Sequence, residues 1–279
     1  MDTKAVTDRL RKEAFLAAYC GGAGHLASAF SSIEILYSLY LGGAMKYDAE
    51  NPDWDGRDYF ILSKGHGSLA LYAVLSEAGF FPKSELWKFC QPGGILGGEP
   101  HILDTPGIEA STGSLGHGLS VGVGMALALQ HDIKPNHVYV LVGDGECQEG
   151  SIWEAIISAV SFKLNNLTMI VDNNRIQKMG FIKDIVGADR ISEKITAFGW
   201  HVENVDGHDI FALASVLAVN RTIDKPRCII ADTIKGKGVS LMENNPAWHW
   251  RMPNKKELKT FMAELSISQE EIDKCKRPI

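Results

Sequence analysis

The sequence has no cluster of basic residues, and its formal net charge is −6, from 28 Lys and Arg against 34 Asp and Glu. Surfaces that bind DNA or RNA need concentrated positive charge, so this balance argues against a nucleic-acid partner. Long hydrophobic runs are also absent. The most apolar helical stretch, residues 119–129, is too short to span a bilayer and is interrupted by Gly122 and Gly124. Because the amino terminus has no signal-peptide core, we expect a cytoplasmic protein without membrane contact.

Cysteine is scarce, and no CxxC pair occurs among Cys20, Cys90, Cys147, Cys228 and Cys275. Zinc sites usually bring cysteines close together in the sequence, and small disulfide frameworks usually use an even number of them. The scattered, odd set therefore predicts reduced thiols in a cytosol rather than a disulfide framework or a zinc site.

Strand and helix patterns alternate from residue 137 onward, and the chain has no internal repeat or low-complexity linker. Apolar spacing predicts helices over residues 2–19, 31–42, 68–79, 116–131, 150–164, 190–198, 209–220, 255–265 and 269–274. Runs rich in β-branched residues predict strands over 59–62, 137–142, 167–172, 201–205 and 228–233. Strands that alternate with helices pair in parallel through crossover helices. The simplest fold is therefore α/β, a single doubly wound, mostly parallel sheet with helices on both faces.

We expect one domain over residues 1–279, with an amino-terminal helix at 2–19 and a carboxy-terminal helical tail at 255–279. Long loops rich in Gly, Pro and His are predicted at 43–57, 91–114 and 235–254. Loops of this length in a compact domain often carry function.

Polar residues follow two predicted strands that a helix connects. Gly143-Asp144-Gly145 ends the first strand, and Asn173-Asn174 ends the second. The carboxyl ends of parallel strands meet at one edge of a sheet, where ligands usually bind. A carboxylate, the Asn174 amide and the carbonyl of Ile176 are oxygen ligands that suit Mg²⁺ carrying a diphosphate, and the glycines let backbone N–H groups approach phosphate. The alternative is a strand-ending turn beside an unrelated Asn-Asn turn.

Three histidines, His25, His66 and His117, stand in or beside glycine-rich turns, and His249 lies in the Trp-His-Trp of the last long loop. Each one alone has a structural explanation, but as a set they favour a ligand site. The remaining histidines have less suggestive surroundings. We expect His131, His137 and His201 to be surface or packing residues, and His208 to shape a turn or cap the next helix.

Several segments match one family in the same order along the chain. They are Gly24-His25, residues 60–67 (FILSKGHG), residues 105–116 (TPGIEASTGSLG), residues 143–150, Asp172-Asn173-Asn174, residues 235–240 (KGKGVS) and Trp248-His249. This set resembles the amino-terminal, diphosphate-binding half of transketolase, and closely the small subunit of split, two-chain transketolases.

The resemblance implies thiamine diphosphate as cofactor and Mg²⁺ as metal, with Ca²⁺ or Mn²⁺ as alternatives. It assigns the metal to Asp144, Asn174 and the Ile176 carbonyl. It assigns proton handling to His25, His66 and His249, with His101 as a further catalytic candidate. Cofactor binding is assigned to His66, Gly113, Ser114, Leu115, Gly143, Asp144, Gly145, Glu146, Asn174, Ile176, Ile234 and His249.

Two of the matched residues also have simple structural explanations. Ile234 fits a strand-core residue equally well. Glu149 matches a carboxylate in a network between subunits, or it favours a helix amino terminus.

Two positions depart from the family pattern. A histidine normally precedes the proline at 100 and contacts the terminal hydroxyl of the donor, but this chain has Glu99-Pro100-His101. His117 stands where many members have glutamine. These changes affect the choice of donor and acceptor sugar, and leave the predicted cofactor site intact.

The family's activating glutamate lies in a pyrimidine-binding domain for which residues 241–279 are too few. We therefore expect a second polypeptide, the carboxy-terminal transketolase subunit, in an α2β2 heterotetramer. The implied reaction transfers a two-carbon ketol unit from a ketose, a phosphate or another anionic sugar, to an aldose acceptor. The alternatives are a thiamine-dependent subunit that decarboxylates 2-oxo acids or forms acyloins, and a non-catalytic cofactor-binding or scaffold subunit.

Overall fold

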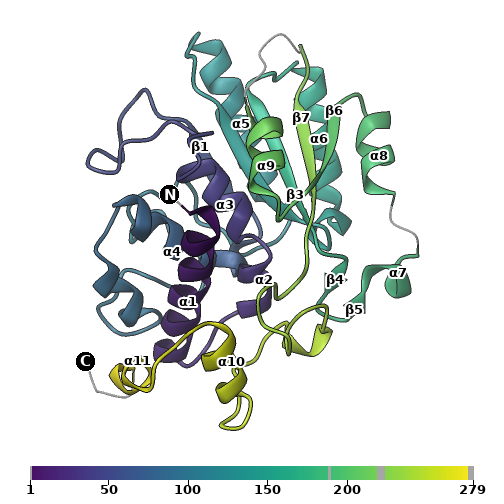
Figure 1. Cartoon of the computed structure of the whole chain (residues 1–279). Coiled ribbons are helices and arrows are strands. Elements are labelled where there is room, and N and C mark those ends of the chain that lie inside the picture. The colour runs from purple at the N-terminus through teal and green to yellow at the C-terminus, as the bar shows by residue number, and fades with distance from the viewer. Residues whose placement is uncertain (1, 188–189, 219–223, 276–279) are drawn as a thin grey trace.

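A five-stranded sheet with the order β1-β2-β3-β7-β6 forms the centre of the computed structural model, which describes residues 2–187, 190–218 and 224–275 (Figure 1). All of its pairings are parallel. The strands are β1 (Tyr59–Leu62), β2 (Val138–Gly143), β3 (Leu167–Asn173), β6 (His201–Asp206) and β7 (Arg227–Asp232). The predicted α/β class is confirmed, and each predicted strand is present.

Apolar side chains cover both faces of the sheet, and for this reason the strands read as nearly continuous apolar runs. Along β2, Tyr139 and Leu141 join one hydrophobic core, whereas Val138, Val140 and Val142 join the other. Every residue of β2 is buried. The sheet is therefore the middle layer between two sets of helices.

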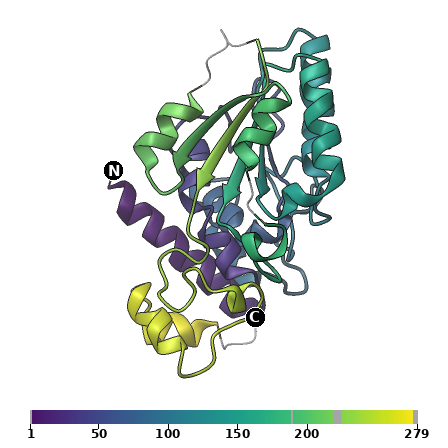
Figure 2. The same ribbon diagram turned by 90° about the vertical axis from the view of Figure 1, so that its right-hand side faces the viewer.

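The two sets of helices differ in their place along the chain. The core on the Val140 side is completed by α5 (Gly118–His131), α6 (Gly150–Ser161) and α8 (Ile191–Ala197). The core on the Tyr139 side is completed by α1 (Thr3–Gly21), α2 (Leu26–Phe30), α3 (Ile33–Tyr40), α4 (Ser68–Ala78) and α9 (Ile210–Leu217). Figure 2 shows the purple amino-terminal helices and the teal α5–α6 pair on opposite sides of the sheet.

Helix α1 has clear signals at both ends. The Asp2 carboxylate accepts hydrogen bonds from the backbone N–H groups of Lys4 and Ala5, which the first helical turn leaves without partners. At the other end, Gly22 adopts a left-handed conformation with φ of 70°, which glycine reaches at the lowest cost.

The expected helix 31–42 corresponds to α3 alone, and Ser31 and Ser32 precede it instead of forming its first turn. The short helix α2, which ends just before these serines, was not predicted. Ser31 Oγ donates a hydrogen bond of 2.7 Å to Asp172 Oδ2 on β3. This tertiary bond lies outside the reach of a local apolar pattern. The expected helix 209–220 ends at Leu217, and its residues 219–220 lie outside the described part of the chain.

The tail expected at 255–279 contains α10 (Leu258–Glu264) and α11 (Gln269–Lys274), and residues 276–279 lie outside the described part. A two-stranded hairpin, β4 (Ile176–Gln177) and β5 (Gly180–Phe181), and α7 (Ile182–Ile185) were not predicted, because such short elements have no periodicity. In the described part of the chain, no helix is both long and apolar enough to cross a membrane.

The expectation of reduced thiols is wrong for one pair of cysteines. Cys20 at the end of α1 and Cys275 after α11 form a disulfide, with their Cα atoms 4.5 Å apart. The two residues are separated by 255 positions, so no local spacing indicates that they meet. The contact of α11 with α1 brings them together, and both figures show the yellow tail beside the purple helix.

The chain changes faces of the sheet between β3 and β7. It leaves β3 towards α8, which packs on the Val140 side, and it leaves β7 into a loop whose Val239, Met242 and Trp248 pack on the Tyr139 side. The loops after these two neighbouring strands therefore diverge. Open α/β sheets bind ligands in the crevice that such a divergence leaves.

Candidate active site

Loops that follow β1, β2, β3 and β7 line a cavity of about 340 Å³ at the carboxyl edge of the sheet. The register pairs Gly143 with Asp172 and Asn173 with Asp232, so the ends of these three strands are level. The predicted site residues that line the cavity are His25, His66, Gly113, Leu115, Gly143, Asp144, Gly145, Glu146, Asn174, Ile176 and His249.

Asp144 is a buried carboxylate at the end of β2. Its Oδ1 accepts a hydrogen bond of 2.7 Å from the N–H of Gly145, and its Oδ2 accepts one from the N–H of Arg175. Burial, and then the nearby Asp172 carboxylate, raise the pKa of Asp144 to about 7. Among the described residues Asp144 has no ion-pair partner. A cation beside it would remove this electrostatic penalty.

The other expected metal ligands lie beside this carboxylate. Asn174 Oδ1 accepts from the N–H of Ile176 at 3.1 Å, and the Ile176 carbonyl accepts from Lys235 Nζ at 2.7 Å. In the described part of the chain, no three His, Cys, Asp or Glu side chains are grouped to hold a metal ion. The expected metal site has only one of these residue types, Asp144, and its other ligands are the Asn174 amide and the Ile176 carbonyl. These hard oxygen donors fit Mg²⁺ or Ca²⁺.

A buried ion pair stands behind these ligands. Lys64 Nζ donates to Asp172 Oδ2, and the two side chains are 1% and 0% exposed. Asp172 also accepts from Asn174 Nδ2 at 3.2 Å and from the Thr233 hydroxyl. Asp172 therefore fixes the orientation of the Asn174 amide, with Nδ2 towards Asp172 and Oδ1 of Asn174 on the other side.

Lys64 and Lys235 are cavity residues that the sequence reasoning did not assign. Both lie inside matched segments, FILSKGHG and KGKGVS, which could have indicated them as site residues. Burial, and then the nearby Lys64 ammonium, lower the pKa of Lys235 to about 8. Asp172 balances the charge of Lys64, so the positive charge that favours an anionic ligand here is that of Lys235.

Three histidines from different loops converge on the cavity. The ring centroids of His25 and His66 are 5.1 Å apart, those of His25 and His249 are 5.3 Å apart, and those of His66 and His249 are 5.7 Å apart. Burial, and then the Lys235 ammonium, lower the pKa of His25 to about 4 and that of His249 to about 3. Burial also moves the pKa of His66 well below its usual value. All three rings are therefore neutral at pH 7.

The tautomer of His249 follows from its neighbour. Lys235 Nζ lies 3.2 Å from His249 Nδ1, and an ammonium only donates, so Nδ1 is the accepting nitrogen. The proton of the neutral ring is then on Nε2. His208 has the opposite arrangement, because its Nε2 accepts from the Ile234 N–H at 2.8 Å and its Nδ1 faces Glu34 at 2.9 Å.

Three predicted site residues lie outside the cavity lining. His101 is half exposed, and its Nδ1 lies 3.0 Å from Asp104. Ser114 is exposed. Ile234 lines a neighbouring cavity of about 520 Å³, together with Asn174. The structure therefore brings three of the four catalytic candidates together and separates His101 from them.

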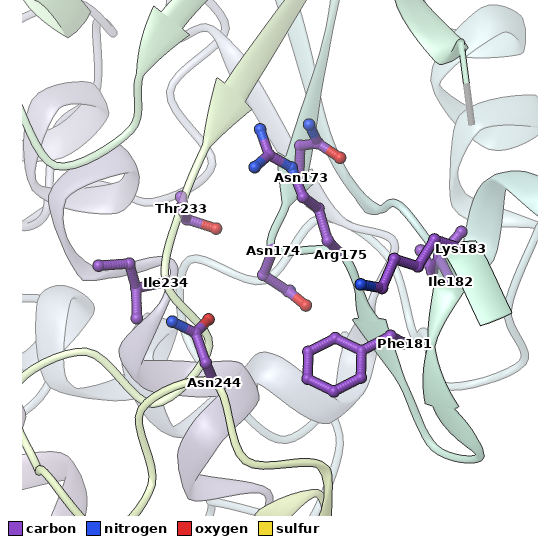
Figure 3. Close-up of a pocket in the computed structure, with 9 residues that line it drawn as sticks. All are labelled: Asn173, Asn174, Arg175, Phe181, Ile182, Lys183, Thr233, Ile234 and Asn244. Carbon is purple, nitrogen blue, oxygen red and sulfur yellow. The ribbon is translucent and has the colours of Figure 1, made fainter. Parts of the chain in front are cut away.

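The neighbouring cavity occupies the crevice between the loops that follow β3 and β7 (Figure 3). In this view the Asn174 amide and the Lys183 ammonium point into the space, whereas the Arg175 guanidinium turns away. Arg175 pairs with Asp232 at 2.8 Å. Asn174 lines both cavities and forms part of the wall between them.

Glu146 holds the loops of the site in place. One oxygen accepts from the Gly116 N–H at 2.9 Å and from the Ser63 hydroxyl, and the other accepts from the Gly143 N–H at 3.0 Å. The carboxylate thus joins the loop after β1, the end of β2 and the loop before α5. These bonds explain its burial without a direct ligand contact.

The chain matches the family model described as transketolase, thiamine diphosphate binding domain, over residues 3–272. It is 42% identical to the 6-deoxy-6-sulfo-D-fructose transketolase subunit SqwG of Clostridium sp. (strain MSTE9), over 88% of this chain and 89% of that one. It is 41% identical to a subunit of the apulose-4-phosphate transketolase of Actinobacillus succinogenes, over 91% of this chain and 92% of that one.

Among solved structures, the transketolase from Leishmania mexicana superposes with a TM-score of 0.87 and 28% sequence identity. The match covers 99% of this chain and 45% of that protein, so the chain spans less than half of the solved enzyme. Together with the ordered loops around the cavity, these similarities show that the chain belongs to the transketolase family, with the fold of its thiamine diphosphate binding domain.

Proposed function

We propose that the chain is the amino-terminal subunit of a two-chain transketolase that uses thiamine diphosphate and Mg²⁺, with Ca²⁺ or Mn²⁺ as alternatives. The observation that carries this proposal is the meeting of three neutral histidines with a buried, unpaired carboxylate in one cavity. The family match and the relatives named as transketolase subunits support it.

The proposed roles divide the cavity into two parts. Asp144, Asn174 and the Ile176 carbonyl hold the metal, while Gly145 and Lys235 favour the diphosphate. The bound cofactor supplies a nucleophilic carbon and an electron sink. The protein supplies binding, orientation and proton transfer.

The histidine cluster handles protons on the sugar. A neutral imidazole has one N–H donor and one accepting nitrogen, so it can take a hydroxyl proton and later return one. His249 presents its Nε2–H as a donor because Lys235 occupies Nδ1. Rings whose centroids are under 6 Å apart reach adjacent hydroxyl groups of one sugar.

We further propose that the pyrimidine side of the cofactor site and the activating carboxylate come from a carboxy-terminal subunit. Two relatives that are named as subunits, and that the chain covers to 89% and 92% of their own length, support a divided protein. An α2β2 assembly, a cytoplasmic location and an anionic sugar as substrate remain predictions.

The test is reconstitution with the candidate partner chain. We expect no ketol transfer from a panel of ketose phosphates and sulfonates by either chain alone, and transfer to an aldose acceptor when the two are mixed with thiamine diphosphate and Mg²⁺. Full turnover by the isolated chain would refute the divided site. Carbon dioxide release from a 2-oxo acid without ketol transfer would favour the decarboxylating alternative, and no cofactor binding by the mixed chains would favour the scaffold.

A further inference from the structure

A buried cluster of three side chains contacts the loop that carries Lys235. Both oxygens of Glu34 accept from the Arg11 guanidinium, at 2.6 and 2.7 Å, and Glu34 Oε2 also lies 2.9 Å from His208 Nδ1. The exposed fractions of the side chains are 5% for Arg11, 7% for Glu34 and 13% for His208. They come from α1, α3 and the turn before α9, so the cluster exists only in the folded chain.

The cluster holds the loop at two backbone groups, one on each side of Lys235. His208 Nε2 accepts from the Ile234 N–H at 2.8 Å, and Arg11 Nε donates to the Lys237 carbonyl at 2.9 Å. Buried backbone groups are costly to leave without partners, so these two bonds fix the path of the chain on both sides of the lysine.

Lys235 reaches from this loop into the cavity. Its Nζ donates to the Ile176 carbonyl at 2.7 Å and lies 3.2 Å from His249 Nδ1. A lysine side chain is long and flexible, so the place of its ammonium depends on where its backbone is held. The bonds at Ile234 and Lys237 are therefore a condition for the contacts that Lys235 makes in the cavity.

The imidazole of His208 is not needed for the turn in which it lies. Asp206 Oδ1 accepts from the backbone N–H of His208 at 2.9 Å, and the Asp209 carboxylate caps α9. A carboxylate only accepts and a backbone N–H only donates, so the ring carries its proton on Nδ1, towards Glu34, and accepts from Ile234 through Nε2. These bonds indicate a role in the loop rather than in the turn.

We propose that His208 is a positioning residue that fixes the Lys235 ammonium against His249 Nδ1. Glu34 orients the imidazole, and Arg11 completes the hold from the other side of the loop. With the ammonium in place, the proton of the neutral His249 ring stays on Nε2. This inference rests on the proposed function for the use of Lys235 in the site, whereas the place of its ammonium can be measured without turnover.

The test compares two substitutions that each keep one half of the bonding of His208. The side-chain amide of Gln extends about as far as Nε2, so His208→Gln keeps an acceptor for the Ile234 N–H. The amide of Asn extends only as far as Nδ1, so His208→Asn keeps a donor to Glu34 and leaves the Ile234 N–H without its partner. The two variants are equally polar and differ in the contact on which the inference depends.

NMR of the ring nitrogens in the full chain reports the tautomers. In the unmodified chain we expect the proton of His208 on Nδ1 and that of His249 on Nε2. His208→Asn should change the tautomer ratio of His249 by about tenfold, because a hydrogen bond from a charged donor is lost. Lys235→Met removes that donor and should have the same effect. His208→Gln and His131→Asn, which changes an exposed histidine, should leave the ratio within about twofold of its original value.

Calorimetry on the reconstituted pair gives a second readout. His208→Asn should weaken the binding of thiamine diphosphate by about tenfold, and His208→Gln should retain it. A proton on Nε2 of His208 in the unmodified chain would overturn the inference, and this measurement needs no variant to fold. A His249 ratio that changes with Lys235→Met but not with His208→Asn would overturn it as well. Absence of ketol transfer by the unmodified pair overturns the proposed function, while the tautomers still decide the positioning role of His208.

Discussion

The buried pair of Lys64 and Asp172 allows a quantitative prediction about stability. Asp172→Asn leaves the Lys64 ammonium, which is 1% exposed, without its counter-charge. Breaking a buried ion pair by removing one partner costs about 3–5 kcal/mol. The remaining bonds from Lys64 Nζ to the Ser28 carbonyl at 2.9 Å and to Ser32 Oγ at 3.0 Å recover only part of that loss, so we expect a destabilisation of about 3 kcal/mol.

The assay is urea unfolding of the isolated chain, followed by circular dichroism. The matched control is Asp232→Asn, which removes a carboxylate at the end of the neighbouring strand. Asp232 and its partner Arg175 are 48% and 70% exposed, so that change should cost less than about 1 kcal/mol. Both variants keep the side-chain shape, and they differ in burial.

A double-mutant cycle completes the test. Lys64→Met removes the cation, and the double variant Lys64→Met/Asp172→Asn removes both charges together. We expect the double variant to lose about 2 kcal/mol less of its free energy of unfolding than the two single variants lose together. The reason is that neither charge is then left buried alone. Additive losses, or an Asp172→Asn cost equal to that of Asp232→Asn, would refute the reasoning.

Three further results are expected from the site. Asp144→Ala should abolish metal-dependent binding of thiamine diphosphate in calorimetry, and retained affinity would remove this residue from the ligand set. In an NMR titration, the His25 and His249 rings should stay neutral down to about pH 5, since their pKa values are lowered to about 4 and about 3; midpoints near 6.5 would contradict the buried cluster. Burial raises the pKa of Asp172, but the Lys64 ammonium lowers it more, to about 2. The contribution of Asp172 to the free energy of unfolding should therefore hold above pH 4 and fall as the pH drops towards 2.

The sequence predicted the strands closely because burial on both faces leaves continuous apolar runs with polar residues at their ends. Gly143-Asp144 and Asn173-Asn174 follow neighbouring strands, so their meeting at one edge follows from parallel pairing alone. The spacing of residues in the sequence does not indicate contacts between residues that are far apart along the chain. Ser31, expected to start a helix, lies before that helix and bonds to Asp172, and Cys20 pairs with a residue 255 positions away.

The four catalytic candidates show the same limit. His25, His66 and His249 each lie beside a matched motif, and three loops bring them to one cavity. His101 lies only two residues from the cavity residue Glu99, yet it turns outward to Asp104. A position in the sequence indicates a loop, whereas the direction of a side chain depends on the packing around it.

The divergence of the chain between β3 and β7 separates the framework of this site from its chemistry. Each loop there is anchored by a strand at one end and continues towards its own layer of helices. Beyond Ile176 and Lys235, which are proposed to serve the cofactor, either loop can lengthen or change its residues while the hydrogen-bonded ladder beneath it stays intact. Such modularity allows substrate specificity to change during evolution while cofactor binding is kept.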